Sequence, residues 1–191
     1  MLVLARRSWP RCSLARRRTL STLASNPEIK VFANPGSPAS HLLSYLDTQP
    51  PNARLAIGSC TALPPTPPTF SQNARFVSLL NDVVSQHGHE DPDVVSQAQA
   101  LAGRAGRSSL GGWVHLSDRR NPPDFGRTAW PEDILGSVEV SDAGKVVGRL
   151  QPSGTYRIVT NEGILGLSPF MQAKLLQRLK EEESRQGQQQ Q

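Results

Sequence analysis

Paired prolines divide this chain into short segments and limit how long any helix or strand can be. Sixteen of the 191 residues are proline, and pairs occur at 50–51, 64–65, 67–68 and 122–123. Proline lacks the backbone N–H that helices and sheets need, so the stretch 63–69 (LPPTPPT) cannot form a helix or a central strand. We expect that stretch to be an extended connector, and the chain to have long loops between short elements.

The region 26–102 is predicted to be helical and proline-rich. Residues 28–33 alternate like a short strand, and 54–59 form a second candidate strand. Between them, Ser37-Pro38 is typical of a helix start, with serine as the N-cap and proline in the first turn. Apolar residues follow it at helical spacing: Ala39, Leu42, Leu43 and Leu46. We therefore predict a helix there that ends at the proline pair 50–51.

Two more helices are predicted before residue 103. One opens at Ser71 and places apolar residues on a single face: Phe76, Leu80, Val83 and Val84. The other opens at Asp91-Pro92, which repeats the pairing of a capping residue with proline. Residues 103–111 (GRAGRSSLG) are rich in glycine, serine and arginine, which predicts a hinge between two halves of the chain.

The second half, 112–185, is predicted to be a β-meander with a closing helix. Turn residues separate five candidate strands: 113–116, 134–140, 145–150, 155–160 and 164–167. Ser168-Pro169 then predicts the closing helix, and the Gln-rich residues 186–191 predict a disordered tail. The fold class expected is α+β: a small antiparallel β-meander with a C-terminal helix, preceded by a helical, proline-rich N-terminal half.

The positive charge of the chain is concentrated in its first 25 residues. The formal net charge is +5, and six arginines with no acidic residue lie before Pro27. They are Arg6, Arg7, Arg11, Arg16, Arg17 and Arg18. This composition is typical of a mitochondrial presequence, which the negative-inside membrane potential draws inward. We predict a presequence over 1–25, with the segment 18–22 (RTLST) resembling a matrix-protease cleavage site.

Removal of that leader leaves a nearly neutral protein. Without the six arginines, 15 basic residues remain against 16 acidic ones, a net charge of −1. Such a balance gives no electrostatic footprint for nucleic acid. Of the two cysteines, Cys12 lies in the leader and Cys60 would remain alone. One cysteine excludes an internal disulfide, which favours the reducing matrix, with a peripheral place on the inner membrane as an alternative. No apolar stretch is long enough to span a membrane.

The most distinctive segment runs from Ser117 to Arg127 (SDRRNPPDFGR). Three arginines beside a rigid proline pair could grip a carboxylate, a phosphate or an acidic protein surface. Tryptophan and arginine are also favoured at protein interfaces. The predicted binding residues are Arg119, Arg120, Arg127, Trp113, Trp130 and Asp118. The alternative is that the aspartates pair with the arginines internally and only shape the loop.

Other candidate chemistries are weaker. Asp124-Phe125-Gly126 matches a protein-kinase triplet in letters only, because no other kinase motif accompanies it. The cluster 87–91 (HGHED) lacks a second set of ligands for zinc, and Cys60 has no base near it in sequence. The glycines match neither phosphate-binding fingerprint. We therefore predict no metal and no cofactor, and name no catalytic residue.

The second half, from Gly112 to about Lys180, resembles a group of small uncharacterised, apparently mitochondrial proteins of fungi, with shorter plant relatives. The matching stretches are 112–115 (GWVH), 120–123 (RNPP), 126–127 (GR), 131–134 (PEDI) and 156–157 (YR). The resemblance covers roughly 70 residues and none of the first half. It agrees with a mitochondrial address and implies no activity.

These features predict a non-enzymatic matrix accessory or assembly protein that docks on a larger protein complex through the Arg/Pro segment. A respiratory complex is the favoured host, and the mitochondrial ribosome is second because the mature charge is neutral. The competing hypothesis is a small enzyme or anionic-ligand-binding protein whose pocket is lined by Arg119, Arg120, Arg127, His115 and Asp118. A third, an RNA-binding module, would need interleaved aromatic residues on strands, which are lacking.

Overall fold

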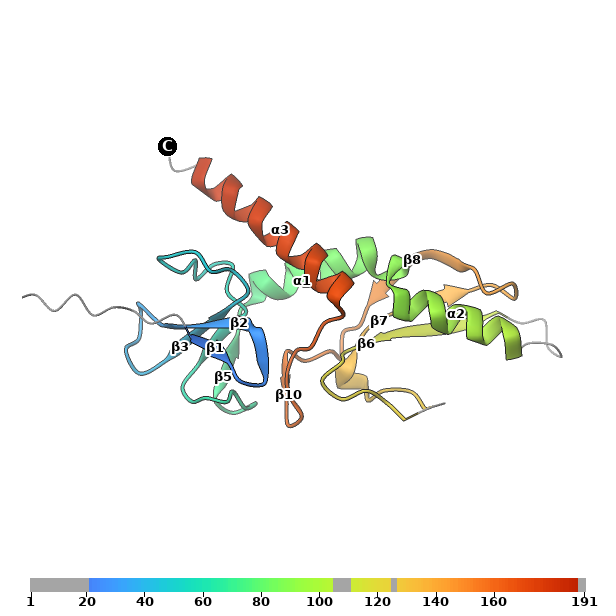
Figure 1. The fold of residues 1–191 in the computed structure, drawn as a ribbon, viewed down its shortest axis with the longest axis horizontal. Coiled ribbons are helices and arrows are strands. Elements are labelled where there is room, and N and C mark those ends of the chain that lie inside the picture. The colour runs from blue at the N-terminus through green and yellow to red at the C-terminus, as the bar shows by residue number, and fades with distance from the viewer. Residues whose placement is uncertain (1–20, 105–110, 125–126, 189–191) are drawn as a thin grey trace, which may run out of the picture.

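The computed structural model describes residues 21–104, 111–124 and 127–188. Two antiparallel sheets lie at opposite ends of an elongated molecule, and helices α1 and α3 run between them (Figure 1). The fold is therefore a mixture of antiparallel sheets and helices that ends in a C-terminal helix, as the fold class predicted.

The first sheet is a five-stranded antiparallel meander with its strands in sequence order. Its strands are β1 (Ser21–Leu23), β2 (Asn26–Ala33), β3 (His41–Ser44), β4 (Gly58–Cys60) and β5 (Phe70–Gln72). The prediction of a helical, proline-rich N-terminal half was wrong, because residues 21–72 form this sheet. Within the first half, only 74–104 are mainly helical.

The helix predicted after Ser37-Pro38 is a turn followed by strand β3. The backbone N–H of Ser40 donates to the carbonyl of Ser37, so Pro38 occupies the second position of a turn. Proline suits that position for the same reason that it suits a helix start, namely its fixed φ. The leucine spacing wrongly predicted a helix, because β3 is buried on both faces and so carries apolar residues at adjacent positions. Leu43 faces the main core, and Leu42 packs with Phe32 and Ala56 in a separate cluster.

The two remaining helices of the first half form where the sequence predicts them. Helix α1 (Ala74–His87) buries the predicted apolar face, and a short 3-10 helix η1 (Gly88–Glu90) joins it to α2 (Pro92–Arg104). The cap of α1 is Asn73 rather than Ser71: its side-chain oxygen accepts from the N–H of Arg75 at 3.0 Å. The predicted hinge, 103–111, lies largely outside the described residues.

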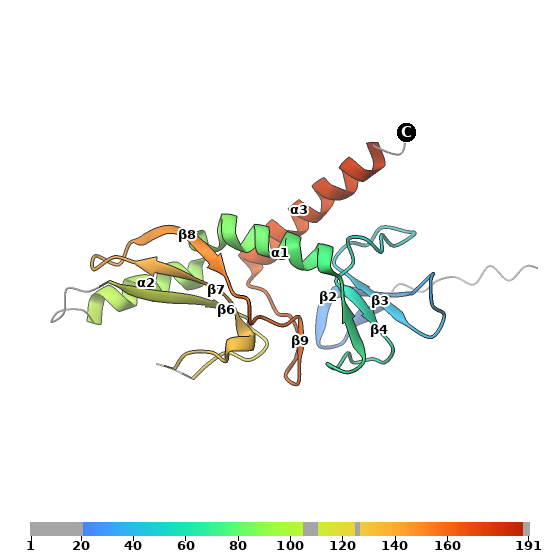
Figure 2. The same cartoon turned by 180° about the vertical axis from the view of Figure 1, so that it is seen from behind.

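The second sheet has three antiparallel strands, β6 (Gly112–Ser117), β7 (Ile134–Val140) and β8 (Val146–Pro152), in that order. A short 3-10 helix, η2 (Pro131–Asp133), precedes β7. The last two predicted strands form a separate hairpin, β9 (Val159–Thr160) with β10 (Gly163–Ile164). Helix α2 lies behind this sheet in Figure 2, so no helix of the described residues covers the opposite face of the sheet.

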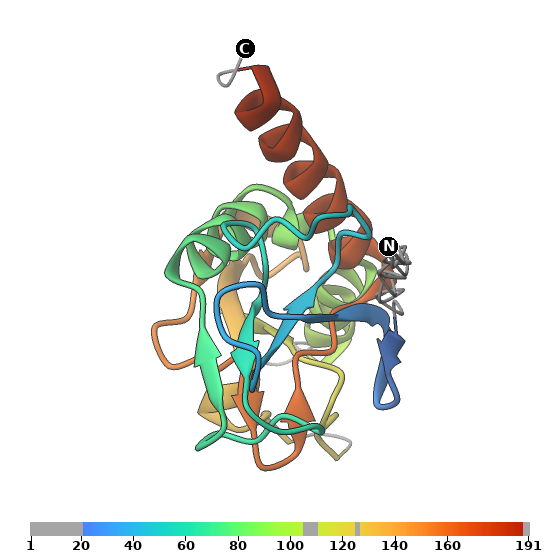
Figure 3. The same cartoon turned by 90° about the vertical axis from the view of Figure 1, so that its left-hand side faces the viewer.

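Helix α3 (Pro169–Gln188) packs against α1 and extends past the body of the molecule at its C-terminal end (Figure 3). Glu182 is buried there, and its carboxylate pairs with Arg75, Arg178 and Arg185. Gln186, predicted to begin a disordered tail, is helical and hydrogen-bonds Asn52. Residues 189–191 lie outside the described part. Among the helices described, none has the length and apolar character needed to cross a membrane.

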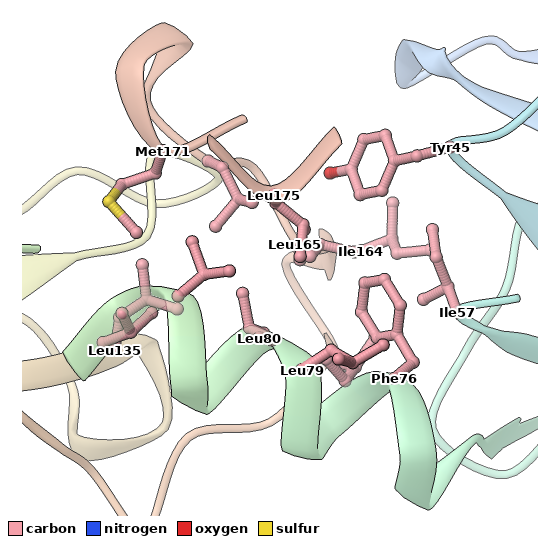
Figure 4. Packing of buried hydrophobic residues seen from close by; sticks show 14 of the residues in the cluster. Tyr45, Ile57, Phe76, Leu79, Leu80, Leu135, Ile164, Leu165, Met171 and Leu175 are labelled. Carbon is pink, nitrogen blue, oxygen red and sulfur yellow. The ribbon is translucent and has the colours of Figure 1, made fainter. Parts of the chain in front are cut away.

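One hydrophobic core joins both sheets. Figure 4 shows side chains from the first sheet and the segments beside it (Tyr45, Ile57), from α1 (Phe76, Leu79, Leu80), from the second sheet (Leu135) and from the C-terminal segment (Ile164, Leu165, Met171, Leu175). They belong to a single cluster of buried residues. The helices α1 and α3 therefore hold the two sheets together by burying apolar surface from each of them.

Candidate functional site

The predicted binding residues lie in the loop between β6 and η2, residues 118–130, which we call the Arg/Pro loop, except for Trp113, which lies near the start of β6. Phe125 and Gly126 of this loop lie outside the described residues. The described side chains divide into two groups. Asp118 and Arg120 point into the protein, whereas Arg119, Arg127 and Trp130 lie at the surface.

Asp118 is buried and organises the start of the loop. Its Oδ1 accepts from the backbone N–H groups of Arg120 and Gly166, both at 2.8 Å, and its Oδ2 accepts from the hydroxyl of Tyr156 at 2.7 Å. Desolvation raises the pKa of the Asp118 carboxyl, and the nearby Arg120 charge and the Tyr156 hydrogen bond oppose that effect. Burial and the Asp118 charge raise the pKa of Tyr156 well above its ordinary value, so its hydroxyl remains a donor.

Arg120 has only 3% of its side chain exposed. Its Nε donates to Asp133 Oδ1 at 2.7 Å, and its two terminal nitrogens donate to the backbone carbonyls of Ile158 and Glu132 at 3.0 and 2.9 Å. The guanidinium also lies 5.4 Å from the ring centroid of Tyr156. For Arg120 and Asp118, the structure therefore favours the alternative in which these side chains pair internally and shape the loop.

Arg119 and Arg127 are available to solvent. Arg119 forms a two-point contact with Asp93 at the start of α2, with nitrogen–oxygen distances of 2.8 and 3.1 Å. Both side chains remain roughly half exposed. Arg127 is 79% exposed and lies 4.0 Å from Asp124, which is 85% exposed. Exposed pairs of this kind contribute little to stability, so these arginines remain free to meet a partner.

The two predicted tryptophans are exposed in different places. Trp113 lies on β6, opposite in direction to the buried Val114, and shares a cross-strand row with Glu139 and Val147 on the uncovered sheet face. Trp130 ends the Arg/Pro loop directly before η2 and is 70% exposed. A large aromatic side chain held at the surface by an ordered segment is a common anchor of protein interfaces.

Trp130 lines a groove of about 720 Å³ between the two sheets. The other lining residues are Gln72, Pro131, Glu132, Gly154, Thr155, Tyr156 and Arg157. The lining residues come from three parts of the chain, 72, 130–132 and 154–157, which are up to 85 residues apart. No local sequence pattern could therefore have predicted the groove. Of the residues proposed for a ligand pocket, none lines this groove: Arg119, Arg120, Arg127, His115 and Asp118 all lie elsewhere.

The remaining candidates show no assembled chemistry. His115 Nδ1 lies 2.7 Å from the Ser137 hydroxyl, as directly opposed residues of β6 and β7. Burial raises the pKa of the Cys60 thiol, which disfavours the nucleophilic thiolate. His87 and His89 each lie 3.8 Å from Glu90. Within 21–104, 111–124 and 127–188, no group of three or more suitable side chains could hold a metal ion.

Comparison of the chain with models of protein families, with curated proteins and with solved structures finds no match.

Proposed function

We propose that this chain is a non-enzymatic accessory or assembly protein of the mitochondrial matrix that docks on a larger protein complex. A respiratory complex is the preferred host. The observation that supports docking most directly is Trp130, which is 70% exposed beside the groove. Exposed Arg127 lies three residues before it in the same loop. Tryptophan and arginine are the side chains that most often dominate the energy of protein interfaces.

The same geometry supports docking over the ligand-pocket alternative. That alternative requires Arg120, Asp118 and His115 to face one cavity. Instead, the first two are buried with each other and with Asp133, and His115 lies on β6 opposite Ser137. A catalytic function would require residues other than those predicted. Docking requires only the predicted binding residues that are exposed.

The matrix address depends on the predicted leader, and the position of β1 supports a leader that ends before Ser21. Residues 1–20 are outside the described part, but β1 begins at Ser21 and pairs with β2. Leu23 is buried in the core. Cleavage at residue 25 would remove β1, so the proposed cut lies before Ser21, within the 18–22 segment. After that cut the protein is nearly neutral, which favours a protein host over ribosomal RNA.

The test is co-purification from isolated mitochondria with the tagged chain and its Trp130→Ala variant. Removing an anchoring tryptophan is expected to cost about 2 kcal/mol or more of binding energy, roughly a thirtyfold loss of affinity. Val95→Ala is the matched control, because Val95 is an exposed apolar side chain on α2 that does not line the groove. Host subunits should be lost with Trp130→Ala and retained with Val95→Ala. Equal recovery with both variants would contradict the proposal.

A further inference from the structure

Strand β5 forms an open edge of the first sheet. The sheet order ends at β5, so within the described parts of the chain only one side of this strand is paired. Thr61 donates its N–H to the carbonyl of Thr69, and Asn73 donates to that of Ile57, both at 3.0 Å. Because alternate residues of a strand face the same neighbour, 69, 71 and 73 face β4. The N–H and C=O groups of Phe70 and Gln72 therefore point to the open side.

These main-chain groups have no backbone partner among the residues that the structure describes. An unpaired strand edge presents donors and acceptors at the spacing that another extended chain requires. Natural proteins use such edges to bind extended segments of their partners, with main-chain hydrogen bonds giving affinity and side-chain pockets giving specificity. The edge at Phe70 and Gln72 supplies the unpaired main-chain donors and acceptors for such binding.

The groove beside Trp130 supplies a place for the side chains of the bound segment. Gln72, the last residue of β5, lines one part of it, and the stretches 130–132 and 154–157 line the rest. The open edge and the groove therefore share a residue. A chain that extended β5 would place alternate side chains in the groove. Trp130, at 70% exposure, offers an aromatic surface for one apolar side chain of that segment.

Two charged residues line the groove without pairing. The backbone N–H of Arg157 donates to the carbonyl of Glu132 at 3.1 Å. Their side chains, however, form no ion pair or hydrogen bond with each other or with another described residue. The Arg157 guanidinium can accept an acidic side chain in a two-point contact. Glu132 would repel a second acidic residue nearby, so a run of acidic residues does not fit.

We propose that this groove binds an extended segment of a partner protein. The segment adds as a strand to the edge of β5, places one acidic side chain against Arg157 and lays an apolar side chain against Trp130. This inference rests on the proposed docking function and names the chemistry of its partner. Open main-chain groups favour a peptide over a small anion, which could use Arg157 but not the strand edge.

The experiment is selection of short random peptides on the immobilised full chain, followed by binding measurements with the enriched peptides. We expect those peptides to combine one acidic residue with apolar neighbours. Arg157→Glu should weaken their binding by about tenfold or more, and a lysine in place of the peptide's acidic residue should restore it. Arg149→Glu, an equal change of charge on β8, should have little effect. Arg157→Gln should show a smaller loss and guards against misfolding of the reversed variant.

Hydrogen exchange reports whether the bound peptide forms a strand. The amides of Phe70 and Gln72 should exchange more slowly when peptide is bound, whereas the amide of Ser71, which faces β4, should change little. The inference is overturned if no peptide is enriched, if Arg157→Glu binds equally well, or if Phe70 and Gln72 gain no protection. If these peptide experiments fail but Trp130→Ala still reduces co-purification of the host complex, strand addition is wrong and the docking proposal stands. If the peptides bind as expected but no host complex co-purifies, strand addition stands and docking on a larger complex is wrong.

Discussion

Arg120 lies in a cluster of charged and polar side chains that is closed to solvent. Two carboxylates, Asp118 and Asp133, and the Tyr156 ring surround its guanidinium, and each carboxylate is at most 1% exposed. A buried charge is tolerated only when its partners compensate for the lost hydration. The cluster thus holds the start of the Arg/Pro loop against Glu132 and Asp133, close to where Trp130 lies exposed.

Removing the positive member of this cluster should be costly. Arg120→Met keeps much of the side-chain volume but leaves Asp133 and Asp118 without their cation, so we expect a loss of about 3–5 kcal/mol in the free energy of unfolding. Urea unfolding followed by circular dichroism measures it. The control is Arg127→Met, because the Arg127 side chain is 79% exposed. Equal unfolding midpoints for the two variants would show that the cluster is not buried as described.

Asp118 should leave a signature in the pH dependence of stability. Desolvation raises the pKa of its carboxyl above the ordinary 3.8, so the folded chain binds this proton more tightly than the unfolded chain does. Ionising Asp118 therefore costs stability as the pH rises from below 3.8 through the raised pKa. Asp118→Asn lacks this cost. Its free energy of unfolding should rise relative to that of the natural chain across that window, and a relative fall would contradict the assignment.

The sequence indicates an unusual Arg/Pro loop but not which of its arginines is buried. Arg119 and Arg120 are adjacent and of the same type, so nothing in the local sequence shows which of them is buried. What distinguishes them is distant: the Arg120 partners include Ile158, 38 residues away. Trp130 was singled out from the sequence and is exposed. Arg157 and Gln72 were not predicted as site residues, because only the tertiary fold brings them to the groove.

At the scale of elements, a capping residue followed by proline marks a helix start in two of three places. Asp91-Pro92 and Ser168-Pro169 open α2 and α3, whereas Ser37-Pro38 forms a turn. The dihedral angles of proline fit both structures, so the residues that follow decide between them. After Ser37 those residues pair with β2 and β4, and both faces of β3 become buried. Such tertiary pairing cannot be read from local spacing.

The two genuine helix starts also meet each other. The Ser168 hydroxyl donates to Asp91 Oδ2 and accepts from the N–H of Met171, while Asp91 Oδ1 accepts from the N–H of Asp93. Both side chains are buried. The first turns of α2 and α3 therefore share one carboxylate, whose negative charge suits the positive ends of both helices.

A double-mutant cycle measures this coupling. Asp91→Ala and Ser168→Ala should each destabilise the protein by about 1–2 kcal/mol through loss of a helix cap. Because the two residues act on each other, the double variant should lose about 0.5–1.5 kcal/mol less than the sum of the single losses. Urea unfolding of the four proteins provides the values. Strict additivity would mean that the two helix starts are capped independently.

The pairing of β7 with β8 depends on a glycine. A Cβ at Gly136 would overlap the Leu150 side chain and lie 2.6 Å from the Gln151 carbonyl oxygen. Gly136→Ala should therefore destabilise the protein by about 1–3 kcal/mol through overpacking. Gly154→Ala is the control, because a Cβ there meets nothing within 4 Å. Thermal unfolding compares the two variants. A Gly136→Ala melting temperature as high as that of the control would argue against the close approach of these strands.

At the scale of the whole molecule, the predicted α+β class holds, but the division into a helical half and a sheet half does not. Both halves contribute a sheet, and α1 and α3 bury apolar side chains of each in one core (Figure 4). Short strands such as β4 and β5, three residues each, leave almost no periodic signal in a sequence. The groove between the sheets was therefore beyond sequence-based prediction.

The shared core joins the two sides of the proposed docking surface. Gln72 belongs to the first sheet, and Trp130 and Arg157 belong to segments beside the second. Buried side chains of both sheets, α1 and α3 belong to one cluster, so the two sides of the groove are joined before any partner arrives. A preformed surface loses less conformational freedom on binding, which favours affinity.

Size separation of native complexes from gently solubilised mitochondria, with mass spectrometry of each fraction, tests the proposed role most directly. If the chain is a docked accessory protein of the matrix, its peptides should peak with the subunits of one much larger assembly. The first residues of its mature form should lie at or shortly before Ser21. A chain found only near its own mass of 20.8 kDa or less, or absent from mitochondria, would contradict the account.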